Sequence, residues 1–361
     1  MPPSVSCRDP RTSVREIVLD EDEVTAVLES LGGLRAAGRE VTGTDLLETA
    51  RAMRSSLPDR VFELTRALHY REDSPACLIR GFPIDDAEIG PTPTHWRDKK
   101  LGVTDLPDLW LVLVSAQLGD LVCWQSIQDG RLVNGIHPIA EQHDHQTGHS
   151  SDVLLDLHIE DAFHEHRCDN LALLCLRNPD STATTIAGID SVDLSDPEFD
   201  VLFEPHFLIE ADDEHKRNLA ALGLSVGDLQ PVATPVLYGS RDSPYIRLDP
   251  PYMSAIPDNA HAERSLNELI RRFADSVVDV VLEPGDLLLV DNHRALHGRR
   301  PFPARYDGTD RWLRRATTVR DLRRSRGHRS SPTDRAMQPT LSRVRADLPT
   351  LPLTLCSRPG T

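Results

Sequence analysis

Short runs of β-forming residues, separated by turn residues, recur from Leu171 to Val319 and limit the folds open to this chain. The runs are LALLCLRNPD, TATTIAGI, PVLYGS, SPYIRLD, VVDVVLEPGDLLLVDN and RWLRRATTV. One helical stretch, AHAERSLNELIRRFADSV, interrupts them, but strands and helices do not alternate as they do in β-α-β units. This succession favours an antiparallel barrel or jelly roll. The predicted fold class is α+β, with a double-stranded β-helix (jelly roll) core flanked by helices.

The segments outside this region follow other patterns. In residues 21–69, apolar residues recur at i, i+3, i+4 and i+7, which predicts helices. The later stretch LWLVLVSAQLGDLVCW is a buried element whose type the pattern leaves open. Residues 1–20 are charged throughout and predict a flexible leader, and residues 323–361, rich in Arg, Ser and Pro, predict a mobile tail. We therefore expect a single jelly-roll domain over residues 21–322, with N-terminal helices.

The charge balance limits the class of partner. Lys and Arg number 40 against 57 Asp and Glu, a formal net charge of −17, and such a surface repels phosphate backbones and anionic lipids. No apolar run is long enough to predict a membrane span or a signal peptide. The six cysteines are scattered, as expected of free thiols in a reducing cytoplasm. We expect a cytoplasmic protein that acts on a small molecule, not on nucleic acid or membrane; homo-oligomerisation stays open.

A histidine and a carboxylate two residues apart, His158 and Glu160, lie in the strand-like segment LDLHIEDAF. Side chains i and i+2 of a strand project to the same side, so both can bind one metal ion. A second histidine, His297, follows the apolar run LLLVDN. Two histidines and one carboxylate on one face of an octahedron leave three positions open, as in non-haem Fe(II) oxygenases. A structural zinc would instead need four protein ligands, usually with cysteine.

Other readings of these histidines stay open. His158 and Glu160 alone also fit a chance surface pair, because the chain has 15 histidines. His293 lies four residues before His297, as in helical zinc-protease pairs, but Arg294 follows it where that motif has glutamate. The remaining histidine clusters are expected to be solvated loop residues and not a second metal site: His143, His145, His149, His164 and His166.

Arg311 and Arg315 share one face of the predicted strand RWLRRATTV, together with Leu313. Two arginines on one strand face can be buried only with carboxylate partners, whereas a solvated face needs none. A cosubstrate and a substrate that each carry a carboxylate would supply these partners. Beside a metal site, this pattern indicates anchors for two carboxylate ligands.

Together these motifs resemble the clavaminate synthase-like group of Fe(II)/2-oxoglutarate-dependent oxygenases, and within it the hydroxylases of free arginine, asparagine and lysine. The matching stretches are HIEDAF, LRNPD, ATT, and HGRR through YDG to DRWL. The similarity extends from about Leu78 to Arg324. The resemblance implies a catalytic domain that uses Fe(II), 2-oxoglutarate and O₂.

The resemblance also implies roles for individual residues. His158, Glu160 and His297 match the iron ligands that form the catalytic centre, and Glu160 is also expected to contact the substrate. Arg311 matches the arginine that pairs with the distal carboxylate of 2-oxoglutarate. Thr185 is expected to hydrogen-bond the same cosubstrate.

Substrate contacts follow in the same way. Arg315 matches the arginine that holds the α-carboxylate of the substrate, and Asp249 matches an acid that meets the cationic side chain. Two positions depart from the arginine hydroxylases. A second aspartate is replaced by Pro251, and the glutamine that touches the amino group falls at Ile127, with Gln128 adjacent.

A single carboxylate suits a compact ammonium better than a planar guanidinium, which prefers bidentate partners. We therefore expect a dioxygenase that hydroxylates an aliphatic carbon of a free basic L-amino acid, with L-lysine at C3 favoured. L-arginine or a derivative at C3 or C4, or a carrier-bound amino acid, is the alternative, and a non-catalytic metal-binding jelly roll is a distant one. Residues 141–152 and 211–230 are polar and irregular, and either segment is a candidate for a loop that closes over the site.

Overall fold

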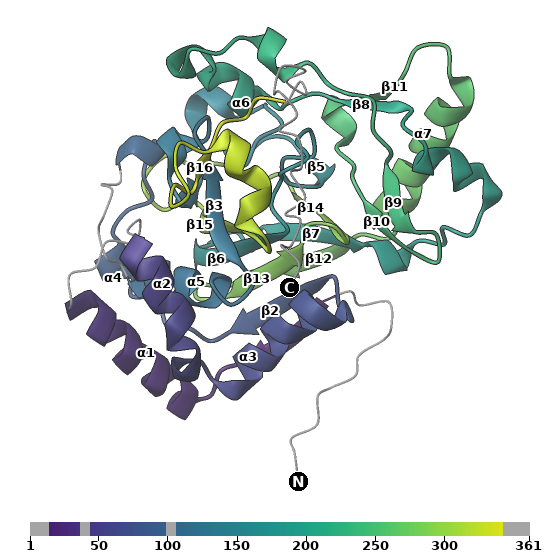
Figure 1. Ribbon diagram of the computed structural model, residues 1–361. Helices are drawn as coiled ribbons and strands as arrows, with labels where there is room; N and C mark the ends of the chain where they lie inside the picture. The colour runs from purple at the N-terminus through teal and green to yellow at the C-terminus, as the bar shows by residue number, and fades with distance from the viewer. Residues whose placement is uncertain (1–13, 37–43, 99–105, 342–361) are drawn as a thin grey trace, which may run out of the picture.

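The computed structural model describes residues 14–36, 44–98 and 106–341, and it contains two main β-sheets with helices around them (Figure 1). The larger sheet has eight strands in the order β1-β2-β13-β6-β15-β3-β16, with β4 paired to β15. Its strands are β1 (Val14–Val18), β2 (Ala76–Arg80), β13 (Leu287–Asp291), β6 (Asn170–Arg177), β15 (Trp312–Val319), β3 (Asp120–Trp124), β16 (Ala336–Met337) and β4 (Val133–Ile136).

The smaller sheet is antiparallel throughout and has the order β12-β7-β14-β5. Its strands are β12 (Val278–Val281), β7 (Ala183–Gly188), β14 (Ala295–Arg299) and β5 (Leu155–His158). Two short antiparallel ribbons complete the β-structure: β9 (Leu237–Ser240) with β10 (Ser243–Ile246), and β8 (Phe207–Ile209) with β11 (Met253–Ala255).

The two main sheets pack face to face. Leu173 and Leu288 of the larger sheet share one apolar cluster with Ile186 of the smaller sheet. Leu289, the next residue of β13, points the other way and joins the cluster beneath the helices. Both faces of β13 are therefore buried, which explains why its sequence is an unbroken apolar run and does not alternate.

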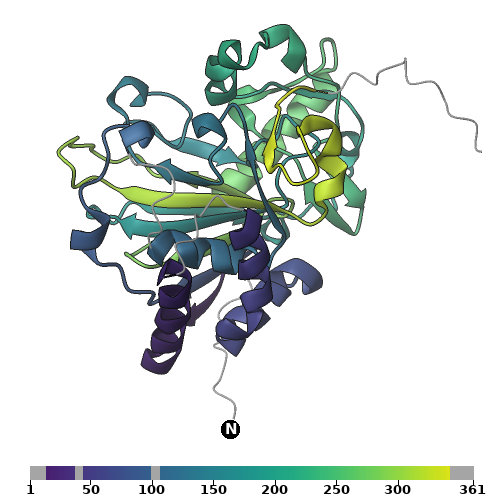
Figure 2. The same ribbon diagram turned by 60° about the vertical axis from the view of Figure 1, so that its left-hand side comes forward.

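Helices cover the outer face of each sheet. On the larger sheet lie α1 (Glu21–Ala36), α2 (Thr44–Ala52), α3 (Asp59–Arg66) and α5 (Leu106–Ser115). The purple helices α1 to α3 lie together on one side of the sheets (Figure 2). Helix α7 (Ala260–Asp275) packs against the outer face of the smaller sheet. Short helices α4 (Asp86–Ile89) and α6 (Asp213–Asn218) lie in the connections.

A buried ion pair fastens α5 to the larger sheet. Arg314 of β15 donates from Nε and Nη2 to the two carboxylate oxygens of Asp108, at 2.7 Å each. Both residues are buried. This bidentate pair compensates two charges that would otherwise be costly beneath the helices.

The coarse prediction of an α+β fold is confirmed, since the sheets mix parallel and antiparallel pairs and helices surround them. The strands expected after Leu171 are present as β6, β7, β9, β10, β12, β13 and β15, and the expected helix is α7. The segment LWLVLVSAQLGDLVCW, whose type the sequence left open, forms most of helix α5 and then strand β3. Within the described residues, no helix is long and apolar enough to cross a membrane.

The predicted leader extends too far, because residues 14–18 form strand β1 and pair in parallel with β2. Val14 packs on the apolar layer between the sheets and Ile17 on the cluster beneath the helices, while Glu16 accepts a hydrogen bond from Arg80 at 3.0 Å. Charged residues on an edge strand commonly protect a sheet against aggregation. In this sequence the same charges led to the prediction of a flexible segment. Residues 1–13 lie outside the described part.

The predicted mobile tail also begins too early. Residues up to 341 are described, and β16 pairs in parallel with β3. Arg329 is buried and donates to the carbonyls of Leu322, Ser331 and Asp334 at 2.9 to 3.2 Å. The arginine-rich composition that predicted mobility therefore includes the residue that holds this turn together. Residues 342–361 lie outside the described part.

Candidate metal centre and active site

The three predicted metal ligands, His158, Glu160 and His297, place one donor atom each within 4.8 Å of one another. His158 ends β5 and is the Cα partner of His297 in β14, so strand pairing sets the two rings side by side, with centroids 4.3 Å apart. Glu160 Oε2 lies 3.4 Å from His297 Nε2. The donors occupy one small volume, as a facial set of metal ligands requires.

The protonation states of this group suit metal binding. His158 Nδ1 lies 2.8 Å from the carbonyl of Asp156 and donates to it, which leaves the Nε2 lone pair for a metal. Burial lowers the pKa of His158 to about 4, so the ring is neutral at neutral pH. Burial would raise the pKa of Glu160, but Arg315 and His297 hold it well below its ordinary value. A neutral His158 imidazole and an ionised Glu160 carboxylate, with the His297 ring beside them, make a donor set that fits Fe(II).

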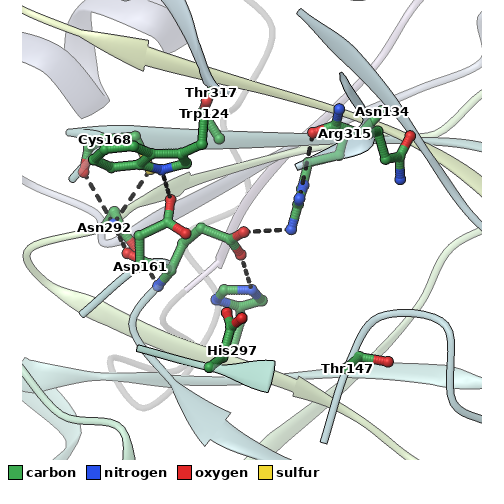
Figure 3. A network of polar contacts seen from close by, with 12 residues as sticks. Trp124, Asn134, Thr147, Asp161, Cys168, Asn292, His297, Arg315 and Thr317 are labelled. Atoms are coloured by element: carbon green, nitrogen blue, oxygen red, sulfur yellow. Dashed lines mark hydrogen bonds and ion pairs between the residues drawn. The ribbon is translucent and has the colours of Figure 1, made fainter. Parts of the chain in front are cut away.

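Asn292 holds the backbone of Glu160 in place (Figure 3). Its Oδ1 accepts from the Glu160 amide at 2.8 Å, and its Nδ2 donates to the Glu160 carbonyl at 3.0 Å and to the Cys168 carbonyl at 2.9 Å. Sequence reasoning missed this role. The only signal was an amide residue at the end of an apolar strand, and strand pairing decides what it meets.

A second group with donor atoms within 4.8 Å consists of Asp161, Asp212 and His215. His215 is fully buried, with Nε2 3.0 Å from Asp161 Oδ1 and Nδ1 2.7 Å from Ser126 Oγ. Trp124 also donates to Asp161, at 2.7 Å. Because both imidazole nitrogens have partners, this group fastens α6, part of the predicted 211–230 loop, beside the metal centre.

The predicted arginine face is confirmed as a geometric arrangement, because Arg311, Leu313 and Arg315 line one cavity with the metal group. Arg315 donates to Glu160 Oε1 and, at 3.3 Å, to Asn134 Oδ1 (Figure 3). Its Nε has no partner among the described residues. It also lines the adjoining acidic pocket, so it lies where the two cavities meet.

Arg311 is buried and forms no ion pair within the described residues. Its Nη2 donates to Thr184 Oγ1 at 3.1 Å, and burial lowers its pKa to about 10. The sequence resemblance had instead predicted that Thr185 hydrogen-bonds the cosubstrate that Arg311 binds. Strand β7 alternates, so Thr185 points to the opposite face, where its hydroxyl faces Gly298. Thr184 therefore takes the place beside Arg311.

The acidic pocket is lined by six carboxylates: Glu160 and Asp161, described above, and four more, Asp156, Asp212, Glu214 and Asp249. None of these four pairs with a lysine or arginine in the described part of the chain. Burial, and then the charge of Asp212, raise the pKa of Asp249 well above its ordinary value. Burial also raises the pKa of Glu214 to about 7. Such a cluster is costly unless a cation enters.

Gln128 does not lie where the sequence placed it. Its Nε2 donates to the Gly135 carbonyl at 2.8 Å and its Oε1 accepts from the Gly135 amide at 3.0 Å. Its amide group therefore braces β4 and lines neither cavity. The adjacency to Ile127 was a weak signal, because the backbone turns sharply here, with φ of 45° at Gln128.

Two of the expected loop histidines are buried instead. His149 Nδ1 donates to the His137 carbonyl at 2.9 Å, and His164 Nε2 lies 3.1 Å from the Thr340 carbonyl. His293 has Nε2 2.7 Å from Asp169 Oδ1 and Nδ1 beside the Tyr238 hydroxyl. These rings support loops and are not part of the metal group described above.

Comparison with known proteins identifies the relatives of this chain. A model of the family described as "Taurine catabolism dioxygenase TauD, TfdA family" matches residues 225–317. The enduracididine beta-hydroxylase of Streptomyces hygroscopicus is 37% identical over 341 residues, which cover 88% of this chain and 98% of the relative. The chain belongs to the clavaminate synthase-like Fe(II)/2-oxoglutarate-dependent oxygenases.

Two further comparisons extend this clavaminate synthase-like relationship. The L-ornithine/L-arginine 3-hydroxylase of Catenulispora acidiphila is 34% identical and covers 90% of this chain and 100% of its own length. The solved structure of the non-heme iron oxygenase OrfP, in complex with Fe, succinate and (3S)-hydroxy-L-Arg, matches with a TM-score of 0.83 and 39% identity over 89% of this chain and 99% of OrfP. OrfP has also been solved with Fe and alpha-ketoglutaric acid. The predicted enzyme class and cofactors are confirmed.

Proposed function

We propose that this chain hydroxylates C3 of a free basic L-amino acid, using Fe(II), 2-oxoglutarate and O₂, and that its two sheets form a jelly roll. The observation that carries the proposal is the pair of cavities that meet at the metal group. One cavity contains buried Arg311 without a carboxylate partner, and the other contains four carboxylates that pair with no lysine or arginine among the described residues. An anionic cosubstrate and a cationic substrate complement these charges.

The chain's own residues would hold each component as follows. His158, Glu160 and His297 hold iron, which when bound supplies the activation of O₂ and of a C–H bond. Arg311 and Thr184 hold the distal carboxylate of 2-oxoglutarate. The buried cavity orients the two reactants and excludes water, which is the contribution that a protein makes to cofactor chemistry.

For the substrate, the unpartnered Nε of Arg315 suits an α-carboxylate, since this guanidinium lies where the two cavities meet. Asp249 and Asp212 suit the cationic end, because both line the acidic pocket. Glu160 lines both cavities as well and lies between the two ends. A substrate held at both ends presents one aliphatic carbon to the metal.

The choice between lysine and arginine depends on the number of carboxylates at the cationic end. The sequence argument for lysine assumed Asp249 alone, but Asp212 lines the same pocket. Two carboxylates suit a planar guanidinium with five donors. The relatives also include an L-ornithine/L-arginine 3-hydroxylase and OrfP, which was solved in complex with (3S)-hydroxy-L-Arg. We therefore place arginine first and keep lysine beside it in the test.

The experiment is anaerobic reconstitution with Fe(II), followed by O₂, 2-oxoglutarate and each free amino acid in turn, with succinate and product mass measured. Arginine, ornithine or lysine giving succinate and a product with one added oxygen supports the proposal. Succinate without an amino-acid product points to a carrier-bound or different substrate. If no amino acid leads to succinate formation, the proposal is contradicted.

The cytoplasmic location and the possible homo-oligomer stay predictions.

Asp249→Ala is expected to weaken binding of the preferred amino acid by roughly 30-fold or more, because a buried charge partner is worth about 2–5 kcal/mol. Asp212→Ala should weaken it as well, whereas Asp213→Ala, at the adjacent and exposed position, should not. KM values for the three variants measure the effect. Equal KM values in Asp249→Ala and the wild type would show that Asp249 does not contact the cation.

A further inference from the structure

Arg299 is a buried arginine that faces the cavity of the metal group. It lies two residues after His297 in β14, so both side chains project to the same side, and it lines that cavity. Its Nη2 donates to Ser150 Oγ at 2.8 Å and approaches the Val153 carbonyl at 3.3 Å. Its Nε and Nη1 are buried and meet no acceptor among the residues that the structure describes.

Arg299 and Arg311 both lie next to Thr184. Thr184 is the Cα partner of Arg299 across β7 and β14, and its Oγ1 accepts the hydrogen bond from Arg311. Both guanidinium groups also line the cavity of the metal group.

The cavity offers these two cations no carboxylate of their own. Glu160 is the only acid that lines it, and Arg315 already donates to Glu160. Buried guanidinium groups without an anion are strongly unfavourable, and unsatisfied N–H groups add to the cost. The site therefore favours an anionic ligand that contacts both arginines.

We propose that Arg299 is a second cationic contact for the distal carboxylate of 2-oxoglutarate, beside Arg311. The proposal rests on the function proposed above and names a binding residue that the family resemblance did not supply. The distal carboxylate has two oxygens, which can accept from Arg311 on one side and from the free Nε and Nη1 of Arg299 on the other.

The same guanidinium connects the two cavities. Ser150 and Val153, which accept from Arg299 Nη2, belong to the loop that carries Thr147 and Gly148 into the wall of the acidic pocket. Cosubstrate bound to Arg299 would therefore steady one wall of the substrate pocket. Arg299 is a contact residue for the cosubstrate and a positioning residue for this loop.

The test measures binding to Fe(II)-loaded protein by anaerobic calorimetry, with 2-oxoglutarate and with 2-oxobutyrate, which lacks the distal carboxylate. Arg299→Gln is expected to bind 2-oxoglutarate roughly 10- to 100-fold more weakly, the loss of charge-assisted hydrogen bonds, and 2-oxobutyrate as the wild type does. Arg300→Gln is the matched control, because Arg300 pairs with Asp279 at the surface.

Arg299→Lys keeps the charge and serves as a second variant in case Arg299→Gln does not fold. Its affinity for 2-oxoglutarate should lie between those of the wild type and Arg299→Gln. Unchanged 2-oxoglutarate affinity in both variants would overturn the proposal. An equal loss for 2-oxobutyrate would overturn it too, since the effect would then not concern the distal carboxylate. A wild-type protein that binds neither 2-oxo acid would instead refute the proposed function itself.

Discussion

Replacing His297 with alanine is expected to abolish stable Fe(II) binding and to lower turnover at least 100-fold. Mutation of a residue that only hydrogen-bonds a metal ligand can already lower metal affinity or activity by up to about 100-fold. Only His158 and Glu160 would remain of the three donors that lie within 4.8 Å. The ring lies at the surface of a cavity, so its removal should leave the strands in place. Iron content after anaerobic dialysis and succinate formation measure the two effects.

His261→Ala is a suitable control, because this histidine lies on α7, with its side chain 48% exposed. His293→Ala tests the rival ligand, whose Nε2 lies 2.7 Å from Asp169 Oδ1. Full iron content in His297→Ala, or loss of iron in His293→Ala alone, would contradict the proposed ligand set.

Replacing Asp108 with alanine is expected to lower the free energy of unfolding by about 3–5 kcal/mol, the cost of leaving one partner of a buried ion pair without the other. Arg314 donates two hydrogen bonds of 2.7 Å to Asp108, and both residues are buried. The pair fastens α5 to β15. Urea unfolding of the metal-free protein measures the loss.

The double variant Asp108→Leu with Arg314→Met removes both charges and should recover most of this stability. Asp279→Ala breaks the exposed pair with Arg300 and should change stability little. A small effect of Asp108→Ala, similar to that of Asp279→Ala, would show that water reaches Arg314 and that the pair is not a stabilising anchor.

Much of the local structure was predictable from periodicity. A period of two identified β15 and separated Arg311 and Arg315 on one face from Arg314 on the other. The same rule predicted that His158 and Glu160 share one side of a strand; their donor atoms do lie together, but β5 ends at His158 and Glu160 follows in a turn. These inferences succeed because strand geometry depends on neighbouring residues alone.

Predictions based on composition were less accurate. Charge at the N-terminus and arginine near the C-terminus predicted mobility, yet β1 and β16 pair with the larger sheet. Composition indicates only how well a segment is solvated on average. Whether the segment pairs as a strand depends on individual contacts, such as the hydrogen bond between Arg80 and Glu16. The predicted substrate contact of Gln128 was wrong for a related reason. Adjacency in sequence does not determine which carbonyl a side chain reaches.

By itself, the sequence determined the strand succession, the three candidate metal ligands and the family resemblance, because these depend on local spacing and on motifs. Only the tertiary structure decided which hydroxyl lies beside Arg311, since the register of β7 directs Thr184 inward and Thr185 outward. It also brought Asp212 and Asp249 into one pocket. Contacts between residues so far apart in the chain depend on sheet packing, and no local pattern encodes them.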